Sequence, residues 1–371
     1  MKVLIIGALP SSLVNFRGEL IKSLVANGHE VVAMASGASV EDVRNIENLG
    51  LKYVDYPVQR NGINPFSDIK TLLNFKKVFK VEQPDLVLAY TIKPVIWGGI
   101  ATRFFPDIQF YGLITGLGFA FQKGGFKRNV LSFIAISLYR LALSKANKAI
   151  FQNPDNLQVF IENKIISKHA AVRVNGSGVD LTRFVKNTPV TKNFTFLTIA
   201  RLLGEKGLRE YAAAAKIVKQ QYPHVIFQLV GPEDPSPDGI PLAEVRQWHQ
   251  AGDVEYLGGA NDVRPYLQHC NVFVLASYHE GMPRTVLEAM AAGRPILTTN
   301  VPGCKETVIN GENGFLVEKQ NSNQLAEKML WFIENQDQWP AMAEKSHELA
   351  QEHFDVRKVN EQLLNIMNLT R

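Results

Sequence analysis

Several features that define whole classes of protein are missing from this 371-residue chain. Two cysteines, Cys270 and Cys304, are too few for a disulfide scaffold and suit a reducing compartment. No apolar run reaches the roughly 20 residues of a membrane-spanning helix, since the best candidate, residues 129–139, is bounded by arginines. No Gly-x-Gly-x-x-Gly follows the first apolar run, which disfavours a dinucleotide-dependent dehydrogenase. The first residues superficially resemble a signal peptide, but a strand followed by a loop fits them better.

The charge is mildly basic overall and unevenly distributed. The chain has 40 Lys and Arg against 35 Asp and Glu, a net charge of +5. Residues 1–180 hold 21 basic and 13 acidic residues, whereas residues 181–371 hold 19 and 22. The first half therefore suits an anionic partner, which could be nucleic acid, a phosphorylated ligand or an anionic membrane surface.

Short apolar runs alternate with helical patterns along both halves. Such runs are typical of parallel strands buried on both faces, so we predict an α/β protein with two Rossmann-like, doubly wound domains facing a cleft. The expected first domain covers residues 1–185 and is joined by a C-terminal helix at about 355–371. The expected second domain covers residues 190–352, after a break in the pattern at 184–192. The first helix is expected at 16–26, after a loop that contains Pro10.

The strongest chemical pattern is a strand-loop-helix segment at 272–295. Glu280 lies in the loop, Pro283 suits the first turn of the following helix, and Glu288 lies on that helix. The backbone amides at the start of such a helix lack intrahelical partners and suit a phosphate or a sugar hydroxyl. The other candidate ligand-binding residues of this turn are Gly281, Met282, Arg284 and Thr285.

The segment contains two glutamates, followed by small residues and Gly293-Arg294-Pro295. It resembles the corresponding segment of the retaining glycosyltransferases of family 4, which have the GT-B fold. The resemblance implies that Glu280 lies beside the donor sugar in the catalytic site, that Glu288 binds the ribose and that the other residues of this turn also bind the donor. It implies as well that the first domain binds the acceptor and the second domain binds the nucleotide sugar. Either residue alone is better explained as an ordinary loop or helix residue, but the complete segment in this context is not.

A second segment, residues 199–207, resembles the Arg-x4-Lys-Gly stretch of the same family. The resemblance implies that Arg201 and Lys206 hold the diphosphate, since Arg forks onto phosphate oxygens and Lys adds a point charge. Turns at Gly231 and Tyr256 lie at strand ends where this fold usually holds uracil, although packing explains Tyr256 better than contact with the base does.

Four short segments of the first half, at 90–94, 115–118, 151–153 and 176–184, resemble a bacterial subgroup of the family. The subgroup includes CapM-like capsule enzymes and PglA-type N-acetylgalactosaminyltransferases. The resemblance implies a UDP-sugar donor and an acceptor sugar linked to undecaprenyl diphosphate. Many relatives have a donor-contacting His where this chain has Thr115, next to Gly116, so recognition near O6 of the sugar is expected to differ.

Further candidates for contact with the acceptor or a phosphate lie in the first half: Ser11, Ser12, Asn15 and Lys93. The first three are equally well explained as turn and capping residues. No His, Cys or acidic spacing indicates a metal site, so we expect no metal and no cofactor. The resemblance implies that Arg201 and Lys206 neutralise the diphosphate in place of a cation.

Residues 121–148 carry six Lys and Arg, among them Lys123 and Lys127, and no acidic residue. Apolar residues recur there at helical spacing, which is typical of a helix that lies in a membrane interface. A packed helix with solvated basic residues fits the pattern equally well, but a polyprenyl-linked acceptor favours the membrane. No motif supports binding of nucleic acid.

We therefore predict a retaining hexosyltransferase at the cytoplasmic face of the membrane. It would move an N-acetylhexosamine, GalNAc or GlcNAc, from a UDP-sugar to an undecaprenyl-diphosphate-linked saccharide in bacterial capsule, O-antigen or protein-glycan assembly. A soluble family 4 transferase with another nucleotide sugar and a non-lipid acceptor is the alternative enzyme. A nucleotide-sugar-binding regulatory protein is the non-enzyme alternative, disfavoured by the intact charged residues.

Overall fold

The computed structural model describes residues 1–59, 64–117, 121, 125–189 and 193–370. Their contacts divide the chain into two compact units, residues 1–177 with 357–371, and residues 178–356. Each unit is a parallel sheet covered by helices, so the structure has the expected α/β class.

The first unit is built on a seven-stranded parallel sheet, in the order β3-β2-β1-β4-β5-β6-β7. Its strands are β1 (Lys2–Ile6), β2 (Glu30–Ala35), β3 (Lys52–Asp55), β4 (Leu86–Tyr90), β5 (Gln109–Ile114), β6 (Lys148–Phe151) and β7 (Ala171–Arg173). Its helices are α1 (Pro10–Ala26), α2 (Val40–Glu47), α3 (Pro65–Glu82), α4 (Ile92–Thr102), α5 (Phe126–Leu143), α6 (Pro154–Glu162) and α13 (Val356–Ile366), of which residue 356 falls in the other unit. Because β1 pairs with both β2 and β4, the strand order reverses between β1 and β4.

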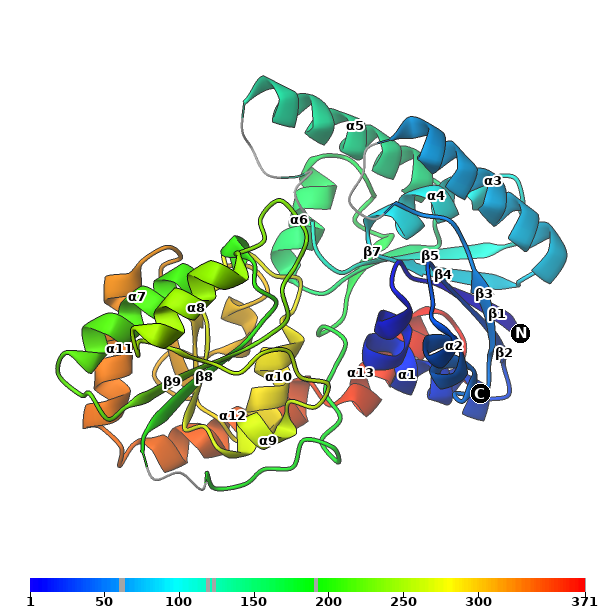
Figure 1. Ribbon diagram of the computed structural model, residues 1–371. Coiled ribbons are helices and arrows are strands. Elements are labelled where there is room, and N and C mark those ends of the chain that lie inside the picture. The colour runs from blue at the N-terminus through cyan, green and yellow to red at the C-terminus, as the bar shows by residue number, and fades with distance from the viewer. Residues whose placement is uncertain (60–63, 118–120, 122–124, 190–192, 371) are drawn as a thin grey trace. The chain divides into compact units, whose positions relative to one another are not determined.

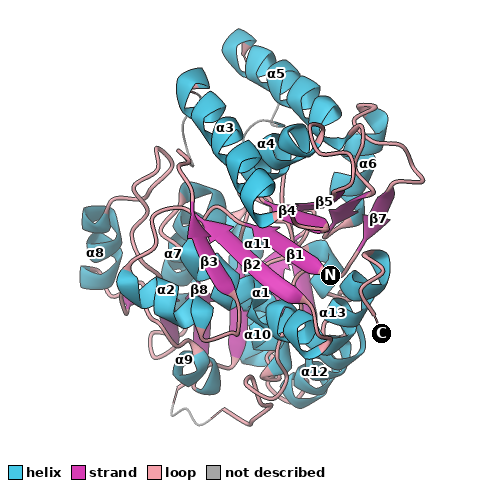
Figure 2. Cartoon of the chain, turned by 90° about the vertical axis from the view of Figure 1, so that its right-hand side faces the viewer, coloured by secondary structure: helices cyan, strands magenta, loops and turns pink. Residues whose placement is uncertain are grey.

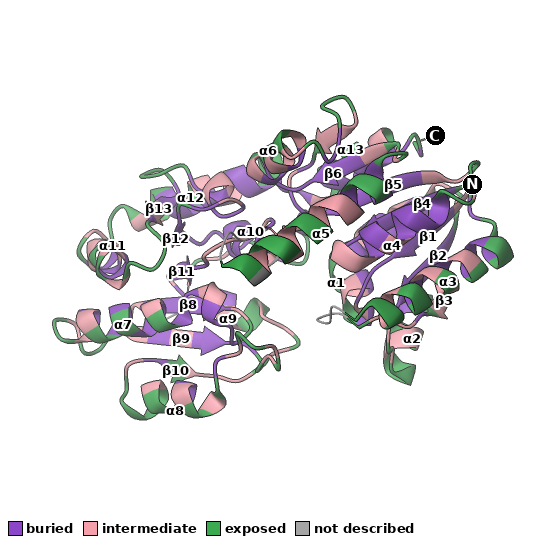
Figure 3. Ribbon diagram, turned by 90° about the horizontal axis from the view of Figure 1, so that it is seen from above, coloured by how far each residue is buried: buried purple, intermediate pink, exposed green. Residues whose placement is uncertain are grey.

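Helices cover both faces of this first sheet (Figures 1 and 2). One face buries apolar side chains of α3, α4, α5 and α6, and the other buries those of α1, α2 and α13. The central strands are therefore apolar throughout, with Val3 to Ile6 fully buried. Figure 3 shows the same division, with buried strands and helices that expose their outer sides.

The second unit is built on a six-stranded parallel sheet, in the order β10-β9-β8-β11-β12-β13. Its strands are β8 (Thr195–Ile199), β9 (Ile226–Val230), β10 (Glu255–Tyr256), β11 (Val272–Leu275), β12 (Ile296–Thr299) and β13 (Gly314–Val317). Its helices are η2 (Gly204–Lys206), α7 (Leu208–Lys219), α8 (Leu242–Gln250), α9 (Arg264–Gln268), α10 (Arg284–Ala291), η3 (Lys305–Thr307), α11 (Ser322–Glu334) and α12 (Trp339–His353). Here the strand order reverses between β8 and β11.

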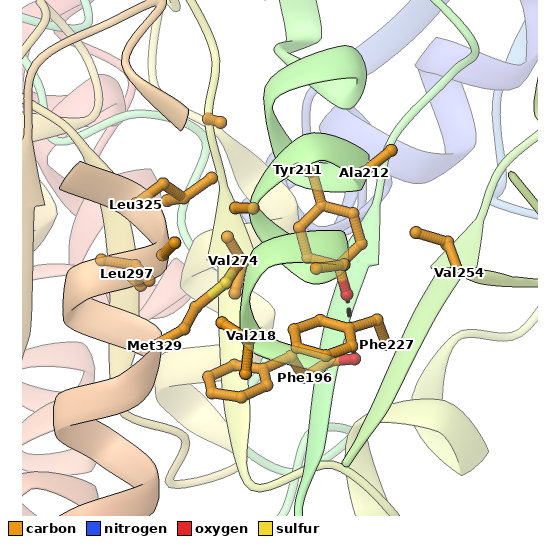
Figure 4. Close-up of a cluster of buried hydrophobic side chains, with 14 of the residues drawn as sticks. Phe196, Tyr211, Ala212, Val218, Phe227, Val254, Val274, Leu297, Leu325 and Met329 are labelled. Carbon is orange, nitrogen blue, oxygen red and sulfur yellow. Dashed lines mark hydrogen bonds between the residues drawn. The ribbon is translucent and has the colours of Figure 1, made fainter. Parts of the chain in front are cut away.

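Apolar side chains fill the core between this sheet and α7, among them the aromatic rings of Phe196, Tyr211 and Phe227 (Figure 4). The rings of Phe196 and Phe227 stack with their centroids 5.1 Å apart. The hydroxyl of the buried Tyr211 donates to the carbonyl of Phe196 at 3.0 Å. The one polar atom of this ring is thus satisfied, as a buried hydroxyl requires.

Two expected boundaries differ from the structure. Helix α1 begins at Pro10 and not at residue 16, because Pro10 occupies the first helical turn, where its fixed φ is suited. The boundary between the units lies at 177/178 and not at 184–192. The reason is that Val179 forms a bridge with Asp355 and Phe184 is buried in the core of the second unit.

Candidate active site

Two loops of the second unit meet where its strand order reverses. The loop after β8 carries Arg201 and Lys206, and the loop after β11 carries Glu280. The reversal point at the carboxyl ends of parallel strands is the usual ligand site of a doubly wound sheet. The fold therefore brings both sequence motifs to one place.

The two loops are joined by an ion pair. Nζ of Lys206 lies 2.5 Å from Oε1 of Glu280, and their side chains are only 16% and 14% exposed. Burial alone would lower the pKa of the Lys206 ammonium, but the charge and hydrogen bond of Glu280 outweigh it and raise that pKa. Lys206 is therefore a fixed positive charge at neutral pH.

The glycine between Lys206 and helix α7 makes this approach possible. Gly207 has a φ of +66° and lies so close to β11 that a Cβ would come within 2.0 Å of the carbonyl oxygen of Ala276. Any other residue would have to move the loop. Gly207 thus sets the separation of the two loops.

Further hydrogen bonds hold Glu280 in place. The hydroxyl of the fully buried Ser277 donates to Oε1 of Glu280 at 2.7 Å, and the amide of Glu280 donates to the carbonyl of Pro302 at 3.1 Å. The carbonyl of Ser277 in turn accepts a hydrogen bond from the Thr299 hydroxyl. The carboxylate is therefore fixed from more than one direction, as a preorganised site requires.

A second pair of side chains, Glu205 and His279, joins the same two loops. Oε2 of Glu205 lies 3.1 Å from Nε2 of His279, and the carbonyl of Glu205 accepts the amide of Tyr278 at 2.8 Å. The hydrogen bond to His279 lowers the pKa of Glu205 against the opposing effect of burial. Neighbouring residues of the two loops, Glu205-Lys206 and His279-Glu280, are thus linked twice.

Arg201 is also paired within the second unit, but its side chain is more exposed than that of Lys206. Its guanidinium hydrogen-bonds the carboxylate of Asp234, and its side chain is 50% exposed. Burial would raise the pKa of Asp234, yet hydrogen bonds from Ser236 and the charge of Arg201 lower it overall. The exposed half of Arg201 remains available to an anionic ligand.

Glu288 lies one helical turn along α10 from Arg284, whose Nε lies 2.8 Å from its Oε1. The Glu288 side chain is 8% exposed. Burial raises its pKa, and the nearby charges of Arg284 and Arg183 only partly offset this effect. Glu288 is thus a buried carboxylate on the helix that follows the predicted donor loop. Such a carboxylate suits a hydrogen bond from a neutral sugar hydroxyl.

The remaining predicted donor residues lie around these loops. Gly281 and Pro283 are buried, whereas Met282 and Thr285 are partly exposed at the start of α10. Gly231 is required by space, since a Cβ there would lie 1.7 Å from the carbonyl oxygen of Ala200. The hydroxyl of Tyr256 donates to the carbonyl of Gly231 at 2.9 Å, which gives this ring a packing role.

The candidates of the first unit lie where its own strand order reverses. Ser11, Ser12 and Asn15 belong to the first turns of α1, and not to a loop. The Ser12 hydroxyl donates to the carbonyl of Leu9 at 2.6 Å and lies 2.7 Å from the Tyr90 hydroxyl, so it has a structural role. Ser11 and Asn15 are exposed.

Lys93 and Thr115 lie at the ends of neighbouring strands of the first unit. Lys93, in the first turn of α4, forms a 2.7 Å ion pair with Asp68, and both side chains are about 15% exposed. Thr115 and Gly116 follow β5 and are partly exposed. Gly118, the last residue of this segment, lies outside the described residues.

Helix α5 covers most of the predicted basic amphipathic segment, while residues 122–124, including Lys123, and the side chain of Lys127 lie outside the described part. The helices that the structure describes include none with both the length and the apolarity to span a bilayer. Across the described ranges, no three His, Cys, Asp or Glu residues are grouped so that they could hold a metal.

Comparison with known proteins identifies the family. A model described as "Glycosyl transferases group 1" matches residues 180–352, and one described as "Glycosyl transferase 4-like" matches residues 2–153. The N,N'-diacetylbacillosaminyl-diphospho-undecaprenol alpha-1,3-N-acetylgalactosaminyltransferase of Campylobacter jejuni is 30% identical over 339 residues, 88% of each chain. The chain belongs to glycosyltransferase family 4. It is a hexosyltransferase.

Two further relatives agree with this family. The UDP-Gal:alpha-D-GlcNAc-diphosphoundecaprenol alpha-1,3-galactosyltransferase of Escherichia coli is 28% identical, over 71% of this chain and 70% of its own. The crystal structure of Anabaena Alr3699/HepE in complex with UDP and glucose superimposes with a TM-score of 0.80 over 99% of both chains, at 19% identity. This family 4 enzyme therefore has the predicted GT-B fold.

Sequence reasoning missed several residues of the site. Ser277 and Asp234, which hold Glu280 and Arg201, were not predicted, and neither was the pair of Glu205 and His279. The doublets Glu205-Lys206 and His279-Glu280 could have indicated a double link, since each places an acidic residue beside a basic one. Ser277 and Asp234 carried no pattern that distinguishes them from ordinary loop residues.

Proposed function

We propose that this enzyme transfers an N-acetylhexosamine, GalNAc or GlcNAc, from a UDP-sugar to an undecaprenyl-diphosphate-linked saccharide with retention of configuration. The observation that carries the proposal is the ion pair between Lys206 and Glu280, which joins the two family motifs where the strand order of the second unit reverses. The names of the Campylobacter and Escherichia relatives support the acceptor class.

In the proposed donor site, Lys206 and the exposed half of Arg201 bind the diphosphate. Their charges stabilise UDP as the bond between the anomeric carbon and the phosphate oxygen breaks and that oxygen takes the electron pair. Glu280, fixed by Lys206 and Ser277, orients the donor sugar. Glu288 accepts a hydrogen bond from the ribose, and Arg284 holds its carboxylate in place.

For the chemical step, we propose that the acceptor hydroxyl attacks the face that the diphosphate leaves. The new bond joins the acceptor oxygen to the anomeric carbon, and the proton of the hydroxyl passes to the departing phosphate. A double displacement would need a second carboxylate at the sugar. Glu288 is committed to the ribose in this proposal, which favours attack on the same face.

We also propose that no divalent cation takes part, because Lys206 and Arg201 supply positive charge at the diphosphate. Transfer that continues at its full rate in excess EDTA would agree with this. Loss of activity in EDTA, restored by Mg²⁺ or Mn²⁺, would contradict it.

The acceptor site is proposed to lie in the first unit, with the enzyme at the cytoplasmic face of the membrane. Lys93, Ser11 and Asn15 are the candidates for contact with the acceptor or its diphosphate. The exposed apolar residues of α5, together with the exposed Arg140, would meet the anionic lipid surface. This placement would bring the enzyme to a lipid-linked substrate without a spanning helix.

The test is a panel of nucleotide sugars assayed with a short polyprenyl-diphosphate-linked sugar. We expect UDP release that depends on the acceptor and an α-linked product seen by NMR. Release of UDP without glycosylation of the acceptor would support the donor half and overturn the acceptor. A β-linked product would overturn retention.

A further inference from the structure

Helix α3 exposes an apolar stripe that contributes nothing to the core of the first unit. Phe66, Ile69 and Leu73 are 84%, 51% and 59% exposed. They are three and four residues apart and therefore lie on one face. The opposite face of the same helix buries Phe75 and Phe79 against the sheet. Three large apolar residues in a row on the outer face are costly in water unless they meet a partner.

Lysines continue this outer face towards the end of α3. Lys70, Lys77 and Lys80 are exposed; Lys80 follows Leu73 by seven residues, and Lys70 and Lys77 lie four residues after Phe66 and Leu73, so all three are on the same face. Together, these six residues, Phe66, Ile69, Lys70, Leu73, Lys77 and Lys80, form what we call the α3 surface. An apolar stripe with basic residues is the composition of a helix that lies in a membrane interface.

The acidic residues of α3 do not cancel this charge. Asp68 is paired with Lys93, and its side chain is only 16% exposed. Glu82 is 8% exposed and accepts from both Lys2 and Lys52. The α3 surface therefore presents positive charge without an exposed carboxylate of its own helix.

Helix α5 exposes a matching surface on the same side of the sheet. Its outer face carries Phe126, Phe133 and Ile134, which are 83%, 68% and 47% exposed. Both α3 and α5 pack on α4, which lies between them (Figure 3). Figures 1 and 2 show the two helices together at one edge of this unit. Helix α5 thus adds exposed apolar side chains on the same side of the sheet as the α3 surface.

We infer that the α3 surface is a second membrane-binding element, which acts with α5 and takes an anionic lipid bilayer as its partner. Charge complementarity favours lipid over a second copy of the chain. A two-fold contact would bring the lysines of the α3 surface of one copy against those of the other. The inference deepens the proposed function and rests on it for the location of the enzyme at a membrane.

The test is binding of the full chain to vesicles of phosphatidylglycerol and phosphatidylcholine in equal parts, compared with phosphatidylcholine alone. One variant combines Phe66→Ser, Ile69→Ser and Leu73→Ser. A second combines Lys77→Gln and Lys80→Gln. The matched control is Val40→Ser, which removes an 80% exposed apolar side chain from α2 on the other face of the sheet.

We expect the apolar variant to lower the partition coefficient at least about tenfold. The lysine variant should lower it about fivefold for each lysine, on the anionic vesicles only. The control should bind as the parent does. Apolar and lysine variants that both bind as the control does would overturn the inference. The inference would also be overturned if, without vesicles, the parent sediments as a dimer and the apolar variant sediments as a monomer.

Transfer to a short-chain acceptor in detergent separates this inference from the proposed function. The apolar variant should keep the parent rate in detergent micelles and lose it on vesicles that contain the acceptor. If the parent glycosylates no polyprenyl-diphosphate acceptor but binds vesicles through α3, the proposed function fails while the inference stands. A variant that is equally active on vesicles would show that α3 does not reach the lipid.

Discussion

Replacing Lys206 by methionine removes the positive charge of the central ion pair and keeps the length of the side chain. Glu280 would then keep its hydrogen bond from Ser277 but lose the cation 2.5 Å away. The change therefore tests the link between the loops, which the structure shows, and the proposed binding of the diphosphate by Lys206. Lys206→Arg is the conservative control, because it keeps the charge.

The cost to stability follows from the burial of the pair. Loss of one partner of a fully buried ion pair costs about 3–5 kcal/mol, because the other charge is left unpaired. Lys206 and Glu280 are 16% and 14% exposed, and Ser277 still donates to the carboxylate, so we expect about 2 kcal/mol. For catalysis, loss of a charge at the departing diphosphate should lower kcat about 100- to 1,000-fold.

A double-mutant cycle with Glu280→Gln isolates the pair. Urea unfolding can be followed by tryptophan fluorescence, which reports mainly on the second unit because Trp248, Trp331 and Trp339 lie there. In the Glu280→Gln background, Lys206→Met should cost less than about 1 kcal/mol, since no unpaired carboxylate remains.

Two results would refute this reasoning. Additive effects of Lys206→Met and Glu280→Gln on the free energy of unfolding would show that the pair does not couple the loops. A kcat within about threefold of the parent in Lys206→Met would show that this charge does not stabilise the departing diphosphate.

Three further changes test other parts of the second unit. Because burial raises the pKa of Glu288, its folded form binds the proton more tightly, so its contribution to stability falls as pH rises above about 4.5. Glu288→Gln should remove this fall in urea titrations across pH while raising KM for the donor. Gly207→Ala should lower stability by more than about 1–2 kcal/mol, the cost of its left-handed φ, because its Cβ would also meet Ala276; thermal melting and kcat should both fall. Arg294→Met should cost about 3 kcal/mol in urea unfolding with KM unchanged, because the fully buried guanidinium donates to Asn187 and to the backbone.

The topology was predictable because parallel strands buried on both faces are apolar throughout. The apolar runs of residues 86–90 and 109–114, for example, form β4 and β5. The strands β6 and β7 show no such run, because they are only four and three residues long and each has a charged residue at one end. The start of α1 was misplaced because Pro10 and the serines after it fit a loop as well as a first helical turn.

The two motifs of the candidate site could be recognised in the sequence, whereas the residues that hold them in place could not. Glu280 and Lys206 belong to patterns with fixed spacing, and the fold brings them together. The hydrogen bonds of Ser277 and the ion pair of Asp234 depend on how loops distant in sequence meet, which no local pattern reveals. The exposed stripe of α3 was also missed, since a helix with apolar residues on both sides looks like a buried one until its packing is known.

The most direct test of the central claim compares the parent enzyme and Glu280→Ala in one assay. The measurement is glycosylation of a short polyprenyl-diphosphate-linked sugar from UDP-GalNAc and UDP-GlcNAc, with the melting temperature taken alongside. We predict a single α-linked product from the parent and a rate at least about 100-fold lower in Glu280→Ala. Equal rates in the two proteins, or UDP release without any glycosylated acceptor, would contradict the account.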